Sequence, residues 1–389
     1  QQNLNWRGRY TAHFGQDDAN NVGVNFNLRR NRSHTTSQEI QHTDYLQYGD
    51  SVWQYHRLNT SPSSSQVYSV DAFYNRKLGK MHSIRVSQLF SNEERESDNN
   101  YFDMERNMER LDSISNHTYN MTRRNQTGLR LYLNWEHFSF DVGADLSLTD
   151  QAYEYRRMDG ISADTAVTSF LYTPSLNSSW RYTEHGSVTL AYQFQNRAPS
   201  LSSLVMPTTN DNPLYVQHAN PNLRKELSHN LRLDWRINSH LSYSLSYSPT
   251  QRRISSRSVY DTKTGGVVTT PENIDGNWDI RNAANYTLSL KHGSFDVRAS
   301  HSFNHNVSYV RTQGEAGTVR GLSRNHSCSV SPVFRYFTKL LDLHTSGSYS
   351  YQTTSYDYMD NGDSHHSFNA EVIGELHPGD RWRIGRSEE

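Results

Sequence analysis

The chain has little of three things that usually organise a protein of 389 residues: cysteine, apolar residues and net charge. Its single cysteine, Cys328, cannot form an intrachain disulfide, so a disulfide scaffold is excluded. No run of about 18 apolar residues occurs, which excludes a membrane-spanning helix. The formal net charge of −1 gives no electrostatic reason to expect nucleic acid as a partner.

The low apolar content narrows the class of protein further. Only 34% of the residues are hydrophobic, whereas an ordinary globular domain has about 45–50% apolar residues. Disorder is not favoured, because 12% of the residues are aromatic and the apolar pattern is regular. A membrane β-barrel needs few apolar residues for its length, since its outer band is apolar while its lumen and loops are polar.

The strongest pattern in the chain is alternation of apolar and polar residues with period two. In the segment 186–195, Val188, Leu190 and Tyr192 alternate with small or polar residues, and the segment 231–247 repeats the pattern on both sides of a short turn. Successive side chains of a strand point to opposite faces, so each segment predicts a strand with one apolar and one polar face.

About sixteen segments share this pattern. They are 4–14, 22–28, 68–74, 84–90, 129–135, 138–148, 170–182, 186–195, 231–237, 241–247, 278–290, 295–303, 328–336, 341–351, 368–376 and a last, truncated one that begins at Trp382. The connections alternate between short turns and longer polar loops, as in bacterial outer-membrane barrels. The sequence therefore predicts an all-β, antiparallel transmembrane barrel. A large soluble β-sandwich or solenoid is the alternative, although its strands would average about 5–6 residues.

Two of the long connections have features of their own. The segment 29–67 is polar and ends in a serine-rich stretch, and we expect it to be a loop. The segment 91–125 is rich in charged residues, and we expect a solvated loop there as well. Within it, Tyr101, Met104, Met108 and Leu111 are at helical spacing, which predicts a short surface helix.

Aromatic and charged residues of the predicted strands define two further sets. Aromatic residues near the short turns, in phase with the apolar face, predict a girdle at a membrane–water interface: Trp135, Trp180, Trp235, Tyr336 and Trp382. Residues in the polar phase predict a hydrated lumen with charges of both signs: Arg130, Asn134, Asp141, Asp145, Arg232, Asp234, Arg236, Asp296 and Arg298.

No group of residues predicts catalysis. The nineteen histidines are scattered, and His301 and His305, which share a face, lack a third ligand at useful spacing. The acidic segment Asp357–Asp363 could bind calcium, but its Asn-Gly-Asp sequence is also ordinary turn chemistry. A nucleophile elbow, a phosphate loop and a CxxC pair are absent. We therefore expect no enzyme, no catalytic residue, no metal site and no cofactor.

A motif in one long loop carries a family resemblance. Residues 197–200 read Arg-Ala-Pro-Ser, and residues 220–226 read Asn-Pro-Asn-Leu-Arg-Lys-Glu. This loop resembles the barrel of TonB-dependent receptors, in particular the outer-membrane β-barrel family of the Bacteroidota type. The match falls on Arg197, Pro199, Ser200, Asn220, Pro221, Leu223, Lys225 and Glu226. Arg224-Lys225 stands where that family usually has Lys-Pro.

The resemblance implies a 22-stranded barrel, of which residues 1–389 would be a fragment without the plug domain, the TonB-contacting segment and the terminal strands. It implies a place in the outer membrane of a Gram-negative cell, with the lipid bilayer, TonB, the plug domain and a surface lipoprotein as partners. The implied function is nutrient import, of an oligosaccharide, a peptide or a metal chelate, at residues that the sequence does not identify. A plugless porin or surface adhesin is the alternative, and a soluble β-rich binding module is a third.

Overall fold

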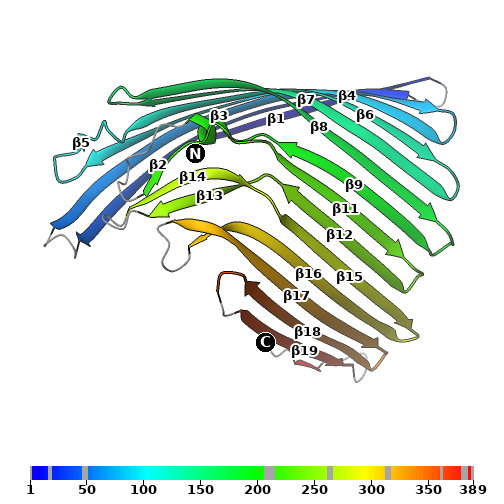
Figure 1. Cartoon of the computed structure of the whole chain (residues 1–389). Coiled ribbons are helices and arrows are strands. Elements are labelled where there is room, and N and C mark those ends of the chain that lie inside the picture. The colour runs from blue at the N-terminus through cyan, green and yellow to red at the C-terminus, as the bar shows by residue number, and fades with distance from the viewer. Residues whose placement is uncertain are drawn as a thin grey trace.

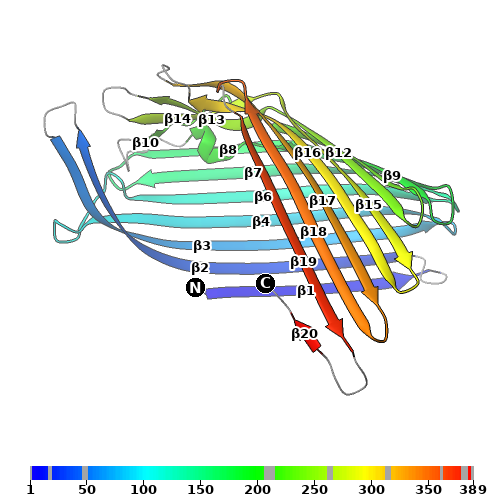
Figure 2. The ribbon, with the colours of Figure 1, turned by 90° about the horizontal axis from the view of Figure 1, so that it is seen from below.

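The computed structural model describes residues 2–15, 20–45, 51–205, 215–260, 266–311, 317–359, 362–377 and 384–386. These residues form one large antiparallel sheet that curls into an arch (Figure 1), and Figure 2 shows its strands from below. Among them, no helix has the length and the apolar character that crossing a membrane requires.

The sheet is a meander of sixteen strands in which each inner strand pairs with the two beside it in the order given next, and each edge strand pairs with one neighbour. The strands are β1 (Gln2–Phe14), β2 (Asn20–Tyr45), β3 (Ser51–Leu78), β4 (His82–Asp103), β6 (Asn116–Asn134), β7 (Phe138–Arg157), β8 (Ser162–Arg181), β9 (Ser187–Arg197), β11 (Glu226–Arg236), β12 (Leu241–Gln251), β15 (Asn277–Leu290), β16 (Gly293–Arg311), β17 (Thr318–Phe337), β18 (Leu341–Tyr356), β19 (Asp363–Leu376) and β20 (Ile384–Arg386). The expected all-β architecture and the sixteen strands are confirmed. In the described residues, the two edge strands β1 and β20 do not pair with each other.

Register joins the apolar faces of the strands into one surface. Directly paired residues of neighbouring strands point to the same side of a sheet. One such row crosses eight strands from β6 to β16: Leu131, Val142, Leu176, Tyr192, Leu231, Tyr247, Ile280 and Phe303. A slip of one residue in any strand would break this row, so the sequence pattern specifies the register.

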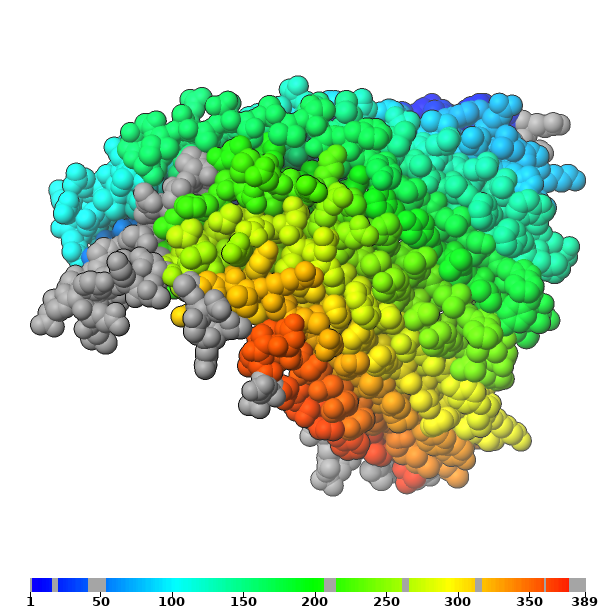
Figure 3. Space-filling view, viewed as in Figure 1, coloured from blue at the N-terminus to red at the C-terminus, as the bar shows by residue number. Residues whose placement is uncertain are grey.

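The side of the sheet that carries this row, called the outer face here, has many exposed apolar side chains. Val142 is 38% exposed, Leu190 45% and Phe170 54%. Figure 3 shows the strands following one another in chain order across a continuous surface. A contiguous apolar surface of this size needs a partner, and hydrocarbon is the partner that an outer band of this kind faces in membrane barrels.

The opposite side, called the inner face, carries polar residues and the folded loops. The short helix α1 (Leu201–Val205) lies on the concave side of the arch (Figure 1). There Leu201 packs with Tyr153 and Tyr155 of β7, and all three side chains are at most 5% exposed. This small cluster gives the inner face a local apolar core.

A second sheet of three strands lies beside α1. It consists of β10 (Tyr215–Gln217), β14 (Val267–Ile274) and β13 (Arg253–Tyr260), in that order. β13 and β14 pair as an antiparallel hairpin up to Tyr260↔Val267. The loop expected near Thr264–Gly266 falls between them, and residues 261–265 lie outside the described residues.

Strands, not loops, fill two of the long polar segments. β2 and β3 pair without interruption from Asn20↔Arg76 to Tyr45↔Ser51, so the expectation of a loop at 29–67 is wrong for residues 29–45 and 51–67. Residues 46–50 lie outside the described residues. The part of β2 beyond Leu28 would extend roughly 55 Å past the apolar band. Polar residues form these strands because each one completes the backbone hydrogen bonds of its neighbour.

The expected loop and surface helix at 91–125 are wrong for the same reason. β4 continues to Asp103 and pairs with β6 up to Asn99↔Asn116, and between them lie a turn and β5 (Glu109–Arg110). Met108 and the residue before it, Asn107, have φ values of 62° and 52°. Such left-handed residues cannot continue an α-helix, so the helical spacing of the four apolar residues was coincidental.

Candidate functional site

The first half of the sequence motif lies where a strand of the wall ends. Arg197 is the last residue of β9, and it pairs directly with Glu226, the first residue of β11. Ser200 precedes α1, and its carbonyl oxygen accepts a hydrogen bond from the backbone N–H of Ser203 at 3.1 Å. The Ser200 and Ser203 hydroxyls lie 2.6 Å apart. Serine is a favoured residue at this capping position, because its oxygen can serve the free N–H groups of the first turn.

The second half of the motif joins α1 to the small sheet. The backbone N–H of Asn220 donates to the carbonyl oxygen of Ser203 at 2.7 Å. The Asn220 side-chain amide donates to the carbonyl oxygen of Pro271 in β14 at 2.8 Å, and its oxygen accepts the N–H of Asn222 at 2.9 Å. The motif therefore fixes the path of the loop between β9 and β11.

Asn273 completes this link, and sequence reasoning missed it. Its Oδ1 accepts the backbone N–H of Arg224 at 2.7 Å, and its Nδ2 donates to the carbonyl oxygens of Arg224 at 3.0 Å and Arg252 at 2.7 Å. One side chain thus fastens the motif-bearing loop to the β13–β14 hairpin. No periodicity or motif marks this residue, because asparagine is common throughout the chain.

The motif faces a polar cavity on the inner face. This cavity, of about 570 Å³, is lined by Arg197, Pro199, Ser200 and Glu226 together with wall residues that include Arg124 and Gln151. Leu223 and Pro221 are not among its lining residues, and Lys225 donates instead from Nζ to the carbonyl oxygen of Phe170 at 2.8 Å. The structure thus brings half of the motif to one cavity, while Asn220 and Lys225 hold the loop through hydrogen bonds.

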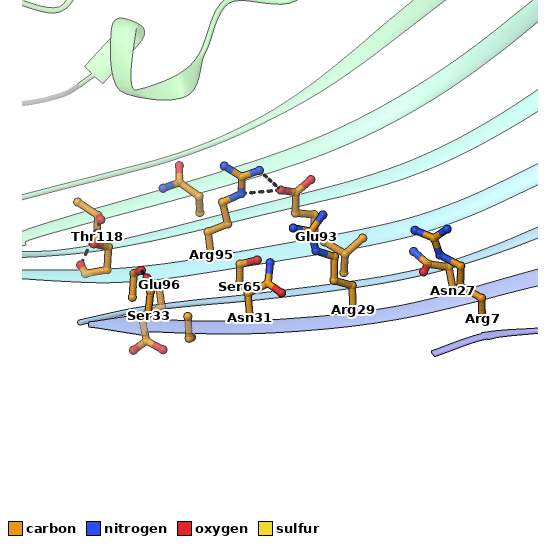
Figure 4. A pocket seen from close by; sticks show the side chains of 15 residues that line it. Arg7, Asn27, Arg29, Asn31, Ser33, Ser65, Glu93, Arg95, Glu96 and Thr118 are labelled. Carbon is orange, nitrogen blue, oxygen red and sulfur yellow. Dashed lines mark hydrogen bonds and ion pairs between the residues drawn. The ribbon is translucent and has the colours of Figure 1, made fainter. Parts of the chain in front are cut away.

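A larger cavity of about 720 Å³ lies on the inner face of β1, β2, β3, β4 and β6. Figure 4 shows the guanidinium groups of Arg7, Arg29 and Arg95 on the same side of the sheet. Arg95 forms an ion pair with Glu93 at 2.5 Å. We call these residues, with the asparagine and serine side chains between them, the arginine pocket. Sequence reasoning missed it because most of its residues lie in segments expected to be loops.

The charges expected in the lumen lie on the inner face in register. Arg130 and Asp145 approach to 3.7 Å, and Arg232 donates two hydrogen bonds to Asp234 at 2.7 and 3.0 Å. Asp141 is the direct partner of Asn177 on the neighbouring strand. The remaining residues of that set lie on β6 (Asn134), β11 (Arg236) and β16 (Asp296 and Arg298).

The aromatic residues expected to form a girdle lie at the end of the sheet where the short turns are. Trp180 pairs directly with Phe138 and Val188, and the Trp235 indole donates to the Tyr182 hydroxyl at 3.1 Å. The rings of Trp135 and Phe138 lie 5.8 Å apart. Tyr336 stands in the same position at the end of β17, whereas Trp382 lies outside the described residues. An interface role for this set is a proposal.

In the described residues, no three His, Cys, Asp or Glu side chains gather closely enough to hold a metal ion. Asp357, from the acidic segment considered for calcium, accepts the N–H of Leu322 at 2.7 Å, and residues 360 and 361 of that segment lie outside the described part. His301 lies against Asn282, whose amide nitrogen is 3.3 Å from its Nδ1.

The contact between α1 and β7 predicts a dependence on pH. Burial, followed by the neighbouring Tyr155, raises the pKa of Tyr153 to about 12 from its ordinary value of 10.0. Tyr153 lies beyond Leu148, outside the apolar band. When α1 is undocked, Tyr153 loses its proton near pH 10, and when α1 is docked, only near pH 12. Docking is therefore fully stable below pH 10 and weakens between these two values.

Limited proteolysis of the segment around α1, measured from pH 9 to pH 12, is therefore expected to accelerate above pH 10. The variant Tyr153→Phe serves as the control and should show no such acceleration in that window. An identical pH profile for both proteins would contradict the conclusion that burial of Tyr153 makes the docking of α1 depend on pH.

Comparisons with known proteins agree with this architecture. The family model described as "Outer membrane protein beta-barrel family" matches residues 14–384. Among solved structures, the FrpB iron transporter from Neisseria meningitidis has 10% identity and a TM-score of 0.45, with 97% of this chain and 65% of that chain covered. The copper transporter OprC has 11% identity and a TM-score of 0.50, with 97% and 65% covered. The siderophore receptor PirA from Pseudomonas aeruginosa has 12% identity and a TM-score of 0.39, with 97% and 74% covered.

The chain therefore spans a little less than two thirds of the length of FrpB and OprC, at 65% of each. At such low identity the likeness to OprC concerns the fold alone. No curated protein matches the chain.

Proposed function

The chain belongs to the outer membrane protein β-barrel family and lies in the outer membrane, and from that premise we propose that it forms part of the barrel wall of a TonB-dependent receptor. This receptor imports a scarce nutrient. The observation that carries the proposal is the pairing of an exposed apolar outer face with a polar inner face that carries folded loops. A barrel wall of a receptor needs both, because one side faces lipid and the other side contacts the cargo.

Partners follow from the same proposal. The complete receptor would contain a plug domain within a 22-stranded barrel and would draw energy from TonB. The motif supports a Bacteroidota-type receptor, in which a surface lipoprotein would assist at the extracellular side. A plugless porin or surface adhesin on the same scaffold is the second candidate. The loops folded over the inner face favour the receptor, since an open pore would keep that space free.

Uptake that depends on TonB is the test. Cells that express the complete protein should deplete the nutrient from the medium, and deletion of TonB should abolish the depletion while the protein stays in the outer-membrane fraction. Depletion at the same rate without TonB would show a passive pore, and the energised mechanism would then be wrong. Surface attachment without any uptake would favour the adhesin.

A further inference from the structure

We propose that the arginine pocket binds a short acidic oligosaccharide, that is, a chain of hydroxyl-rich rings that carry carboxylate groups. This inference rests on the proposed function, because it names the cargo of the receptor. It is carried by the geometry and the chemistry of the first strands of the sheet.

The register brings three guanidinium groups together from distant parts of the chain. On β1, Arg7 pairs with Asn27 of β2, and Arg29 lies two residues further along β2 in the same phase. Through β3, Asn31 is linked to Arg95 of β4, since both pair with Ser65. Figure 4 shows their side chains on the inner side of the sheet, the side on which α1 lies.

The charge of this group is only partly balanced. Of the two carboxylates that line the cavity, Glu93 is the ion-pair partner of Arg95, and Glu96 lies 3.9 Å from the His117 ring. In the described residues, no carboxylate lies within ion-pair distance of Arg7 or Arg29. With the Asn31 amide turned so that its oxygen faces the arginine, that oxygen accepts from Arg29 Nε at 3.0 Å and Nη2 at 2.9 Å. The Arg7 guanidinium, and the part of the Arg29 guanidinium that Asn31 does not occupy, are therefore available for an anion. A guanidinium fork matches a carboxylate with two parallel hydrogen bonds.

The remaining lining supplies neutral hydrogen-bond donors and acceptors at successive levels. Ser33 lies opposite Ser63 with hydroxyl oxygens 2.7 Å apart, and Asn27 lies opposite Ser69. Residues of one phase in a strand are about 7 Å apart, so polar groups repeat along the wall. Such a ladder suits a ligand that presents hydroxyl groups along its length.

A second cavity continues the first toward the short turns. It has a volume of about 320 Å³ and shares Arg7 and Asn27 with the arginine pocket. Asp71 lines it and accepts a hydrogen bond from Asn25 at 3.1 Å. The two cavities adjoin at Arg7 and Asn27, and Phe26 adds an apolar side chain to the second one. We call them together the groove; it runs along β1, β2 and β3 and suits an extended ligand better than a compact one.

The lining argues against the other cargo classes. Val67 is the only apolar side chain among the residues of the larger cavity, so the side-chain pockets that recognise an extended peptide are missing there. Aromatic rings are also absent from that lining, and a neutral sugar would rely on them for stacking. A hydroxyl-rich chain with carboxylate groups matches the groove, because the carboxylates pair with arginines and the hydroxyl groups hydrogen-bond to the asparagine and serine side chains.

The test is calorimetric titration of the complete protein, purified in detergent, with trigalacturonate as the probe and maltotriose as the neutral comparison. Trigalacturonate should bind at least about tenfold more tightly than maltotriose. Arg7→Gln and Arg29→Gln should each weaken trigalacturonate about tenfold, the loss expected for one charge-assisted hydrogen-bonding group. Arg236→Gln removes an exposed inner-face arginine outside both cavities and should leave the affinity unchanged.

Three results would overturn the inference: no binding of trigalacturonate, equal binding of maltotriose, or unchanged affinity in both pocket variants. Tighter binding of triglutamate would assign the groove to acidic peptides instead. Because this titration needs neither TonB nor an energised membrane, its failure is distinguishable from failure of the proposed function. Uptake without TonB would leave the binding result intact.

Discussion

Replacing Leu176 by arginine is expected to lower the free energy of unfolding of the complete protein in phospholipid vesicles by about 2–4 kcal/mol. Leu176 lies in the middle of the apolar row, between its direct partners Val142 and Tyr192. Arginine at this depth would have to leave water for hydrocarbon, and no acidic partner is paired with it on the outer face. Urea unfolding followed by tryptophan fluorescence measures the loss.

The neighbouring residue provides a matched control. Asn177 is exposed on the inner face, and its direct partners are Asp141 and Ala191. Asn177→Arg introduces the same side chain at the same depth, but into a polar lumen beside a carboxylate, and the stability should change by no more than about 0.5 kcal/mol. If both variants lost the same stability, the distinction between a lipid-facing and a lumen-facing side would be wrong.

Asn273→Ala is expected to release the motif-bearing loop from the β13–β14 hairpin. The substitution removes three hydrogen bonds and leaves the N–H and C=O of Arg224 and the C=O of Arg252 without these partners. Each unsatisfied group costs about 1–3 kcal/mol where water cannot replace the partner. The local opening free energy should fall while the wall strands keep their stability.

Amide hydrogen exchange at Arg224 measures this opening. In Asn273→Ala its exchange should be at least about tenfold faster, whereas amides of β11 should exchange as before. Asn222→Ala is the control, because the Asn222 side chain is exposed on the same loop. Unchanged protection of Arg224 in Asn273→Ala would show that other contacts hold the loop.

The family motif separates what could be recognised from the sequence from what only the structure shows. Arg197 and Glu226 could be recognised from sequence as the residues that flank the loop, and they are direct partners in the sheet. Which half of the motif faces a cavity is decided only by the fold, and Asn273, which fastens the loop at Arg224, lies 49 residues later in the chain. A contact of this kind leaves no periodic trace in either segment.

The sequence by itself determined the sixteen strands, their order and the face that each turns outward, because period-two alternation and the contrast of short turns with long loops are local properties. Tertiary structure alone decided that polar segments such as 29–45 and 51–67 continue as strands, since their backbone hydrogen bonds depend on the neighbour and not on their own side chains. It also decided which inner-face charges meet. Arg7, Arg29 and Arg95 share one pocket because the register of four strands aligns them, and register acts between segments that the sequence keeps apart.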